Sequence, residues 1–411
     1  MNKTIWIINK DAAPSHEYAT HIRSTREALY LQSKGYNVKI ICGNRVHNTS
    51  IIHPVKAGYS VERHDGVNYV FVRTISYGNS TFRRVLSYFF FSLQILKLRE
   101  LPTPDIIIHD TKTPFDMFIA YYAKYIKAKY IVDVEDLWPR MFEFMGFMKK
   151  RNPILKILYR MERRLYTMAD HVVFTMEGGA DYITDHEWDL KNGGPINLEK
   201  VHYVNNGIVL DEFEQNKKKN QIEDPDLKND SIFKVVYLGS IRKANNLISL
   251  IEAAKFLLPY KPIKILIYGD GPDRPLLEEK CEKEHITNVL FKEKWIEPQF
   301  VPYVLSNAQI NILNYSLGWA YYGGSMNKMF MSFASGKPIV CNADLRYSEI
   351  KRNHLGVDGY LDTPDKYARG ILSIYNLCEQ EYFTMCQRSL EVAKKYDVPF
   401  LMKKFAEYCN L

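Results

Sequence analysis

Short apolar runs recur along the whole sequence, and segments with helical spacing separate most of them. Strands that alternate with helices in this way predict parallel β-sheets with helical crossovers. We therefore expect an α/β fold. The expected strands are Ile5–Ile8, Val38–Ile41, Val67–Val72, Ile106–His109, Tyr130–Val134, Val172–Thr175 and Val201–Val204, followed by Lys234–Leu238, Ile263–Tyr268, Val289–Phe291, Ile310–Leu313 and Ile339–Cys341.

The strands fall into two series, separated by a polar stretch. A chain of 411 residues is too long for one hydrophobic core, so two domains are expected. Residues 211–230 carry Lys217-Lys218-Lys219 and Asp224-Pro225-Asp226 and predict a linker. We therefore expect domains at 1–210 and 231–392, with a final helical segment at 393–411.

Charge and composition narrow the class of protein. The formal charge of +8 favours an anionic partner such as a nucleotide, a phospholipid surface or a nucleic acid. The longest apolar run, Val85 to Leu96, is shorter than the ~20 residues that span a bilayer, and the N-terminus lacks a signal-peptide pattern. The six cysteines show no metal-binding spacing. We expect a cytoplasmic protein with buried thiols.

The stretch from Gly323 to Cys341 predicts a ligand-binding turn and helix. Gly323 and Gly324 allow close backbone approach, and the apolar spacing after them predicts a helix that ends at Gly336 and Pro338. A helix N-terminus after glycines binds anions, and Lys328 adds a positive charge in the first turn. The alternative is a surface loop and a core helix in which Lys328 is only solvated. The apolar face of this helix comprises Met326, Met329, Phe330, Phe333 and Ala334.

The same stretch resembles the donor-site motif of glycosyltransferase family 4. Three further segments strengthen the resemblance: Asp136-Leu137-Trp138-Pro139, Val204-Asn205-Asn206-Gly207 and Gly269-Asp270-Gly271-Pro272. The family implies the GT-B fold, in which two Rossmann-like domains face each other across a cleft and the C-terminal helix returns to the N-terminal domain. The matching motif residues are Asn327, Lys328, Phe330, Ala334, Gly336, Lys337 and Pro338.

Two departures from the family pattern concern carboxylates. The family's ribose-binding glutamate falls on Met331 in this sequence, and its earlier glutamate falls on Gly323. A thioether is at best a weak hydrogen-bond acceptor. We therefore expect a donor ribose to be held loosely.

The resemblance also implies the residues that bind a nucleotide-sugar donor. Lys328 and Arg242 would stabilise the charge that builds on the leaving diphosphate, and Trp295 would stack on the base. The alternatives are a solvated Arg242-Lys243 pair and a core tryptophan. The donor-binding set is Gly239, Lys243, Gly269, Trp295, Ile296, Gly323, Gly324, Ser325, Met326, Asn327 and Met331, with Lys328 and Arg242 beside it.

The acceptor side is expected at the strand ends of the N-terminal domain. Asp136 best matches the family residue placed against the transferred sugar, with Glu135, His109 and Asp110 nearby. A histidine at such a position is more often structural. Asp133-x-Glu135-Asp136 resembles a metal-binding run, but hard cations need several converging oxygens and the family needs no metal. We expect no metal site and no cofactor.

Two basic, aromatic segments favour an anionic membrane surface. One runs from Phe82 to Arg99, and the other from Trp138 to Arg164. Two packed helices with basic outer faces are the alternative. No nucleic-acid motif is present, so a nucleic-acid partner is not expected.

The resemblance implies a bacterial-type, retaining, metal-independent glycosyltransferase. It would move a sugar from a nucleotide-sugar donor, expected to be a UDP-sugar, to a saccharide acceptor, expected to be lipid-linked, in surface polysaccharide (capsule or O-antigen) synthesis. Peripheral attachment to the inner face of the cell membrane is part of this hypothesis. The alternatives are a GT-B sugar-nucleotide 2-epimerase and a non-catalytic GT-B-like binding or scaffold protein.

Overall fold

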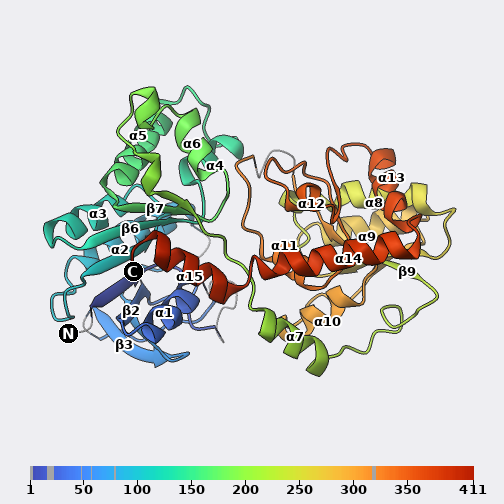
Figure 1. The fold of residues 1–411 in the computed structure, drawn as a ribbon, viewed down its shortest axis with the longest axis horizontal. Coiled ribbons are helices and arrows are strands. Elements are labelled where there is room, and N and C mark those ends of the chain that lie inside the picture. The colour runs from blue at the N-terminus through green and yellow to red at the C-terminus, as the bar shows by residue number, and fades with distance from the viewer. Residues whose placement is uncertain (1–2, 16–22, 48, 57, 78–79, 317–320) are drawn as a thin grey trace. The chain divides into compact units, whose positions relative to one another are not determined.

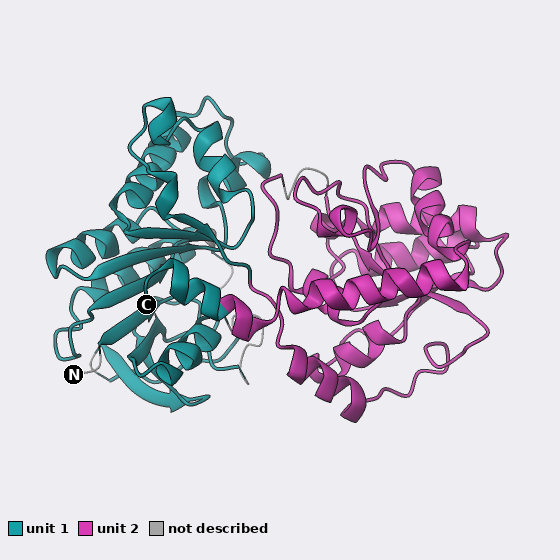
Figure 2. Ribbon diagram, in the orientation of Figure 1, with its two compact units in different colours: residues 1–205, 402–411 teal, residues 206–401 magenta. Residues whose placement is uncertain are grey.

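The computed structural model describes residues 3–15, 23–47, 49–56, 58–77, 80–316 and 321–411. The chain divides into two compact units (Figures 1 and 2). The first unit comprises residues 1–205 and 402–411, and the second comprises residues 206–401. Each unit is built around its own sheet.

The first unit contains an eight-stranded sheet in the order β3-β4-β2-β1-β5-β6-β7-β8. All neighbouring strands are parallel except β3 and β4, which form an antiparallel hairpin at one edge. The strands are β1 Thr4–Ile8, β2 Asn37–Gly43, β3 Tyr59–His64, β4 Val67–Val72, β5 Ile106–Asp110, β6 Lys129–Val134, β7 His171–Phe174 and β8 Val201–Tyr203.

The central strands β1 and β5 of this sheet are buried along their whole length. Strands of a parallel sheet are buried in this way when helices cover both of its faces. The last residues of the chain also belong to this unit. The Tyr408 ring stacks on His202 with the ring centroids 4.9 Å apart, and Lys129 Nζ donates a hydrogen bond to the Cys409 carbonyl. The helices are α1 Arg23–Ser33, α2 Thr81–Ile95, α3 Asp116–Tyr125, α4 Trp138–Phe144, α5 Pro153–Met168, α6 Gly179–Asp185 and, from residue 402 onward, α15 Val398–Tyr408.

The second unit contains a six-stranded parallel sheet in the order β11-β10-β9-β12-β13-β14. Its strands are β9 Phe233–Leu238, β10 Ile263–Tyr268, β11 Val289–Phe291, β12 Ile310–Leu313, β13 Ile339–Cys341 and β14 Gly356–Asp358. Its helices are α7 Leu210–Lys219, α8 Leu247–Leu257, α9 Arg274–Lys283, α10 Val301–Ser306, α11 Asn327–Ala334, α12 Glu349–Arg352, α13 Pro364–Tyr375 and α14 Glu379–Lys394.

Alternate residues of the second sheet pack into different cores. Ile265 and Ile267 of β10 pack with α8 and α13, whereas Leu266 and Tyr268 pack with α10. The long helix α14 packs against α11 (Figure 1), and both contribute to a third cluster. A sheet covered on both faces has strands that read as continuous apolar runs, which is why the sequence pattern located them.

The expected strands are all present, but two strands and one helix differ from the prediction. β3 and β14 are additional strands. Residues 211–230, predicted to be a linker, contain most of α7 and belong to the second unit. Phe213 is buried in the core beside α11, and Leu210 packs against the same cluster. These two apolar side chains give α7 too little periodicity to be predicted from the sequence.

The helix ends agree in part with the prediction. Gly336 has φ +67° after the last residue of α11, as a left-handed C′ residue should. Asn246 precedes α8 but is itself left-handed and forms no side-chain cap. Pro275, rather than Pro272, lies in the first turn of α9. The start of the helix predicted from His21 lies outside the described residues; α1 is described from Arg23.

Two expectations about composition are also addressed by the structure. All six cysteines are free thiols, but only Cys42, Cys341 and Cys409 are buried; Cys281 and Cys386 are half-buried, and Cys378 is exposed. Among the described residues, no helix is long and apolar enough to cross a membrane.

Candidate functional site

The order of strands in the second unit defines where a ligand is expected. β9 has β10 on one side and β12 on the other, so the strand order reverses between β9 and β12. Ligands of open parallel sheets bind beyond the carboxyl ends of the strands at such a point. The residues of interest are therefore those that follow β9 and β12.

Lys328 of α11 reaches the end of β9. A Cβ atom added to Gly239 would lie 2.1 Å from Lys328 Nζ, so only glycine leaves room for the ammonium. Nζ donates a hydrogen bond to Tyr237 Oη at 3.2 Å and lies 4.8 Å from the centre of that ring. Tyr237 Oη in turn donates to the Ser240 carbonyl at 2.7 Å. Tyr237, which the sequence analysis missed, thus positions the lysine.

The charge of Lys328 has no counter-ion within the described part of the chain. Its polar contact there is the hydroxyl of Tyr237, and none of the described carboxylates forms an ion pair with it. Burial lowers the pKa of Lys328 to about 8. Burying an ammonium without a counter-ion is unfavourable, so this arrangement favours an anionic ligand.

The first turn of α11 adds backbone donors beside this lysine. Met326 precedes the helix, and no described side chain caps its first turn. Asn327 is exposed at the helix start, while Met326 is buried. The preceding loop is fixed because the Asn206 N–H donates to Ser325 Oγ at 3.1 Å. Gly323 has φ +89°, which the loop needs, and Gly324 follows it. Such an uncapped helix start can bind an anion.

Gly269, at the end of β10, packs directly against the end of β9. A Cβ atom added at Gly269 would lie 2.0 Å from the Gly239 carbonyl oxygen. The Gly269 N–H donates to the Glu293 carbonyl at 2.9 Å, which draws the segment after β11 to the same edge. Trp295 in that segment is 75% exposed, whereas Ile296 packs against the cluster around α10. The core alternative for Trp295 is therefore wrong.

Arg242 and Lys243 lie in the loop after β9, with exposed side chains. The loop itself is well held. Asn245 Nδ2 donates to the Ser240 carbonyl at 2.6 Å, and Asn314 Nδ2, after β12, donates to the Asn245 carbonyl at 2.8 Å. Both basic side chains therefore project from a fixed loop at the same sheet edge as Lys328.

Met331 is half-buried and packs against the apolar clusters on both sides of α11. Asn342 does not offer a replacement for the absent carboxylate. Its Oδ1 accepts from the Tyr315 N–H at 2.8 Å, and its Nδ2 donates to the Tyr315 carbonyl at 3.0 Å. Asn327 and Glu297 are exposed polar residues that remain available.

The acceptor-side candidates lie at the carboxyl ends of β5 and β6 in the first unit. His109 is 2% exposed; its Nδ1 lies 2.8 Å from Tyr130 Oη and its Nε2 lies 3.6 Å from Asp116 Oδ1. Burial lowers the pKa of His109 to about 3, so the ring is neutral near pH 7. This geometry favours the structural role for His109.

Asp110 is buried and pairs with Lys112, with Nζ 2.8 Å from Oδ2. Lys112 Nζ also lies 3.9 Å from Asp11 Oδ2 after β1. Glu135 is half-buried, and Asp136 is exposed just before α4. Of the four candidates, Asp136 therefore has the most accessible side chain.

Asp133 is not open to a metal ion. Arg23 donates a hydrogen bond to each oxygen of the Asp133 carboxylate, from Nε to Oδ2 at 2.7 Å and from Nη2 to Oδ1 at 3.0 Å. Arg23 Nε also lies 3.0 Å from Glu27 Oε1. A carboxylate held in a buried bidentate pair is committed to the fold, so Asp133 is not available as a metal ligand.

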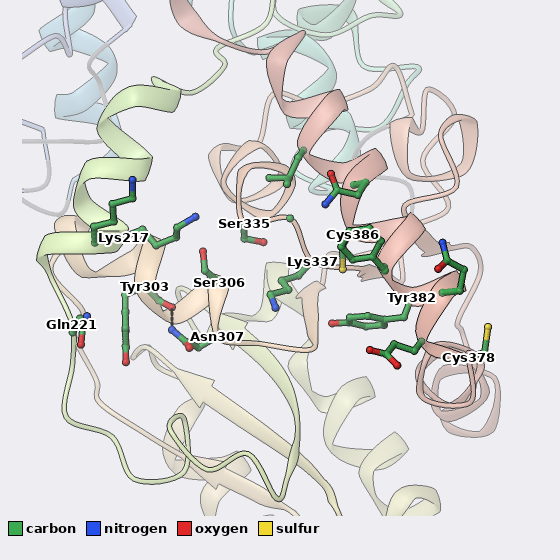
Figure 3. Close-up of a pocket in the computed structure, with 17 residues that line it drawn as sticks. Lys217, Gln221, Tyr303, Ser306, Asn307, Ser335, Lys337, Cys378, Tyr382 and Cys386 are labelled. Atoms are coloured by element: carbon green, nitrogen blue, oxygen red, sulfur yellow. Dashed lines mark hydrogen bonds between the residues drawn. The ribbon is translucent and has the colours of Figure 1, made fainter.

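A cavity of about 1140 Å³ lies elsewhere in the second unit, between α7, α10 and α14 (Figure 3). Ser335 and Lys337 on its wall precede β13, and Asn307 precedes β12. The cavity is therefore at the amino ends of the strands. It is distinct from the candidate donor site, which lies at their carboxyl ends.

Part of the second unit is similar to a known protein family. A family model described as "Glycosyl transferases group 1" matches residues 232–376, which span β9 to α13. No curated protein matches the sequence. Residues 232–376 are thus similar to the glycosyl transferases of group 1, and the predicted enzyme class, glycosyltransferase, is confirmed.

Solved structures are similar over their full length despite low identity. Anabaena HepE in complex with UDP and glucose is 11% identical, with 100% of each chain covered and a TM-score of 0.64. An α,α-trehalose-phosphate synthase (UDP-forming) from Burkholderia vietnamiensis is 11% identical, with 100% of each chain covered and a TM-score of 0.69. Sucrose-phosphate synthase from Thermosynechococcus elongatus is 14% identical, covers 99% of this chain and 98% of its own, and has a TM-score of 0.69. These matches confirm the GT-B fold.

Proposed function

We propose that the protein is a family 4 glycosyltransferase that moves a sugar from a UDP-sugar to a saccharide acceptor with retention of configuration and without a metal ion. One observation carries the proposal: the Lys328 ammonium lies against Gly239 at the switch point of the second sheet without a carboxylate partner among the described residues. The names of HepE with UDP and glucose and of the UDP-forming synthase support UDP as the nucleotide.

The residues of the second unit have distinct roles in this proposal. Negative charge builds on the diphosphate as the glycosidic bond breaks, and fixed positive groups stabilise it. Lys328 and the N–H groups at the start of α11 would contact that diphosphate, with Arg242 and Lys243 reinforcing the charge. The exposed Trp295 ring offers a surface on which uracil stacks.

On the acceptor side we assign Asp136 to the transferred sugar. Its carboxylate is exposed at the end of β6, where it is free to accept hydroxyl hydrogen bonds. Glu135 would assist it, while Asp110, already paired with Lys112, would act on the acceptor only through that lysine.

A lipid-linked acceptor in surface polysaccharide synthesis is supported by an exposed, basic face on the first unit. On α5, Ile154 and Ile157 are exposed, and four basic residues of the same helix are exposed with them. Phe147 in the preceding loop and Phe82 on α2 are each 72% exposed. Apolar groups among basic ones suit a membrane interface that contains anionic lipid. The four basic residues are Lys156, Arg160, Arg163 and Arg164.

The test is a donor screen followed by a turnover assay. Binding raises the melting temperature by mass action, so a panel of nucleotide sugars is first compared by thermal shift. UDP release is then measured with and without saccharide acceptors. Acceptor-dependent release supports the transferase, and conversion of the donor sugar without an acceptor indicates the 2-epimerase.

The non-catalytic alternative is favoured by one observation, the apolar packing of Met331 where the family has a carboxylate. Binding of a nucleotide sugar without any turnover, over a broad acceptor panel, would support that alternative and overturn the proposed transferase.

A further inference from the structure

Three side chains with metal-binding atoms converge at the edge of the first sheet. His53 Nδ1 lies 3.2 Å from Glu62 Oε2, and His64 Nε2 lies 3.1 Å from the same oxygen. The three atoms all lie within 4.8 Å of one another. No other group of at least three potential ligands was found among the described residues.

The three residues come from two segments that the fold brings together. Glu62 and His64 are two positions apart on β3, so their side chains lie on the same face of the strand. His53 belongs to the loop after β2. Its N–H donates to the Asn44 carbonyl at 2.8 Å, and Asn44 Nδ2 donates back to the His53 carbonyl at 3.2 Å.

Neighbouring side chains fix the orientation of His53, Glu62 and His64. The His53 ring is buried and stacks on Phe71 with centroids 3.6 Å apart and an interplanar angle of 8°. His64 meets the same Phe71 ring edge-on, with centroids 6.0 Å apart. Ser60 Oγ donates to Glu62 Oε1 at 3.4 Å and so orients the carboxylate. Ligands oriented in this way lose little freedom when an ion binds.

Two of the three separations between ligand atoms match a tetrahedral metal site. Zinc binds imidazole nitrogen and carboxylate oxygen at about 2.0–2.2 Å, which places neighbouring ligand atoms about 3.3 Å apart at the tetrahedral angle. The two nitrogen–oxygen separations, 3.1 and 3.2 Å, are close to this value. Two imidazoles and one carboxylate suit zinc-class ions, whereas Mg²⁺ and Ca²⁺ prefer six or more oxygens.

We propose that His53, Glu62 and His64 bind a divalent transition-metal ion of the zinc class. Water would fill the fourth position. The ion would fasten the loop after β2 to β3, the edge strand of the sheet. The proposal concerns a site in the first unit and is independent of the donor chemistry of the second. The sequence analysis expected no metal site, because the family that the chain resembles needs no metal, and it did not single out these three residues.

The competing explanation is a hydrogen-bonded triad in which both imidazoles donate to Glu62. The two explanations differ in their response to metal. The triad alone predicts no change in stability when Zn²⁺ is added, whereas a site that binds the folded protein raises its melting temperature.

The experiment uses the full chain after chelator treatment and dialysis. Zn²⁺ is titrated against a chromophoric chelator, with Mg²⁺ as the comparison ion, and melting temperatures are recorded with and without Zn²⁺. Co²⁺ is then substituted, because its visible ligand-field bands distinguish nitrogen and oxygen ligands from the sulfur of the free cysteines. We expect one equivalent of Zn²⁺, a melting temperature raised by Zn²⁺ only, and Co²⁺ bands without sulfur charge transfer.

Single substitutions test whether Glu62 and His64 are the residues that bind Zn²⁺. Glu62→Gln, close in shape to the native residue, and His64→Gln should each weaken Zn²⁺ binding by about 100-fold or more. His202→Gln is the matched control, because His202 Nε2 lies 3.1 Å from His171 Nδ1 in a histidine pair of the same unit. That variant should bind like the wild type. Equal Zn²⁺ affinity in Glu62→Gln, His64→Gln and the wild type, or no Zn²⁺-dependent stabilisation of the wild type, would overturn the proposal.

Discussion

Replacement of Lys328 by alanine should reduce kcat/KM for the sugar donor by about two orders of magnitude, or about 2.7 kcal/mol of transition-state stabilisation. The magnitude follows from the position of the ammonium. It lies at the carboxyl end of β9 and contacts Tyr237 and the backbone at Gly239. An incoming diphosphate would be the first anionic partner of Lys328 among the described residues. The variant therefore loses one charged contact at a half-buried position, which the exposed Arg242 and Lys243 reinforce but do not occupy.

Stability should respond differently from activity. Because Lys328 forms no ion pair with the described residues, its removal leaves no buried carboxylate unpaired. The melting temperature of the variant without donor should therefore stay within a few degrees of the wild type. Lys328→Met, which keeps an apolar stem of similar length, should lose as much activity as the alanine variant if charge is the cause.

The assay is donor-dependent UDP release under subsaturating donor, with a binding titration of UDP beside it. Lys337→Ala is the control, because Lys337 is a half-buried lysine of the same unit that lines the cavity at the other end of the sheet. It should retain near wild-type kinetics. Near wild-type kcat/KM for both Lys328 variants would refute the assignment of Lys328 to the diphosphate.

Four further predictions concern the same proposal. Because the pKa of Lys328 is about 8, the charged form that binds an anion is lost as pH rises. From pH 7, where most of the lysine is charged, the affinity for UDP should begin to fall as pH approaches 8 and be lower by up to about 30-fold at pH 9.5 in a calorimetric titration, and Lys328→Met should abolish this dependence. Trp295→Ala should weaken UDP binding by about 10-fold or more without altering the melting temperature, because the ring is exposed, and full affinity in this variant would exclude stacking. A donor without the ribose 2′- and 3′-hydroxyls should lose less than about tenfold in kcat/KM, since Met331 replaces the family glutamate, whereas a thousandfold loss would show that another group, such as Asn327 or Glu297, holds the ribose. The protein should co-sediment with anionic vesicles at low salt. A variant in which five basic residues are neutralised together should be released from the vesicles: Arg83, Arg84, Lys149, Lys150 and Arg151. The control neutralises five exposed lysines of the rest of the chain and should stay bound, whereas equal binding to neutral vesicles would contradict the electrostatic attraction; these lysines are Lys218, Lys219, Lys283, Lys395 and Lys403.

The strand pattern was predictable because the central strands are buried on both faces and therefore read as apolar runs. β3 was missed because it lies at the sheet edge, where Glu62, Arg63 and His64 interrupt any apolar pattern. The turn Asp65-Gly66 was a usable signal. Both residues have positive φ, 51° and 79°, as a two-residue hairpin turn requires.

The site was predictable only where its residues are close together in sequence. Glycines before a helix with a lysine in its first turn pointed to Lys328 directly. Tyr237, its hydrogen-bond partner, lies 91 positions away and occupies a buried strand, where a tyrosine resembles any other core residue. The proposed metal ligands His53, Glu62 and His64 likewise come from a loop and a hairpin, and no local sequence pattern predicts that these two segments lie side by side.

Trp295 differs from Tyr237, because its residue type predicts burial and the structure shows it exposed. Residue type alone favours burial for tryptophan, yet this side chain is 75% exposed because the segment after β11 is held by its backbone rather than by its ring. Only the fold reveals that the ring is available to a ligand.

The proposed function requires that UDP binds at the carboxyl ends of β9 and β12. A crystal structure of the protein with UDP tests this most directly. We predict diphosphate density beside Lys328 Nζ, Gly239 and the first turn of α11, with uracil on Trp295. UDP in the cavity between α7, α10 and α14, or no UDP bound at millimolar concentration, would contradict the account.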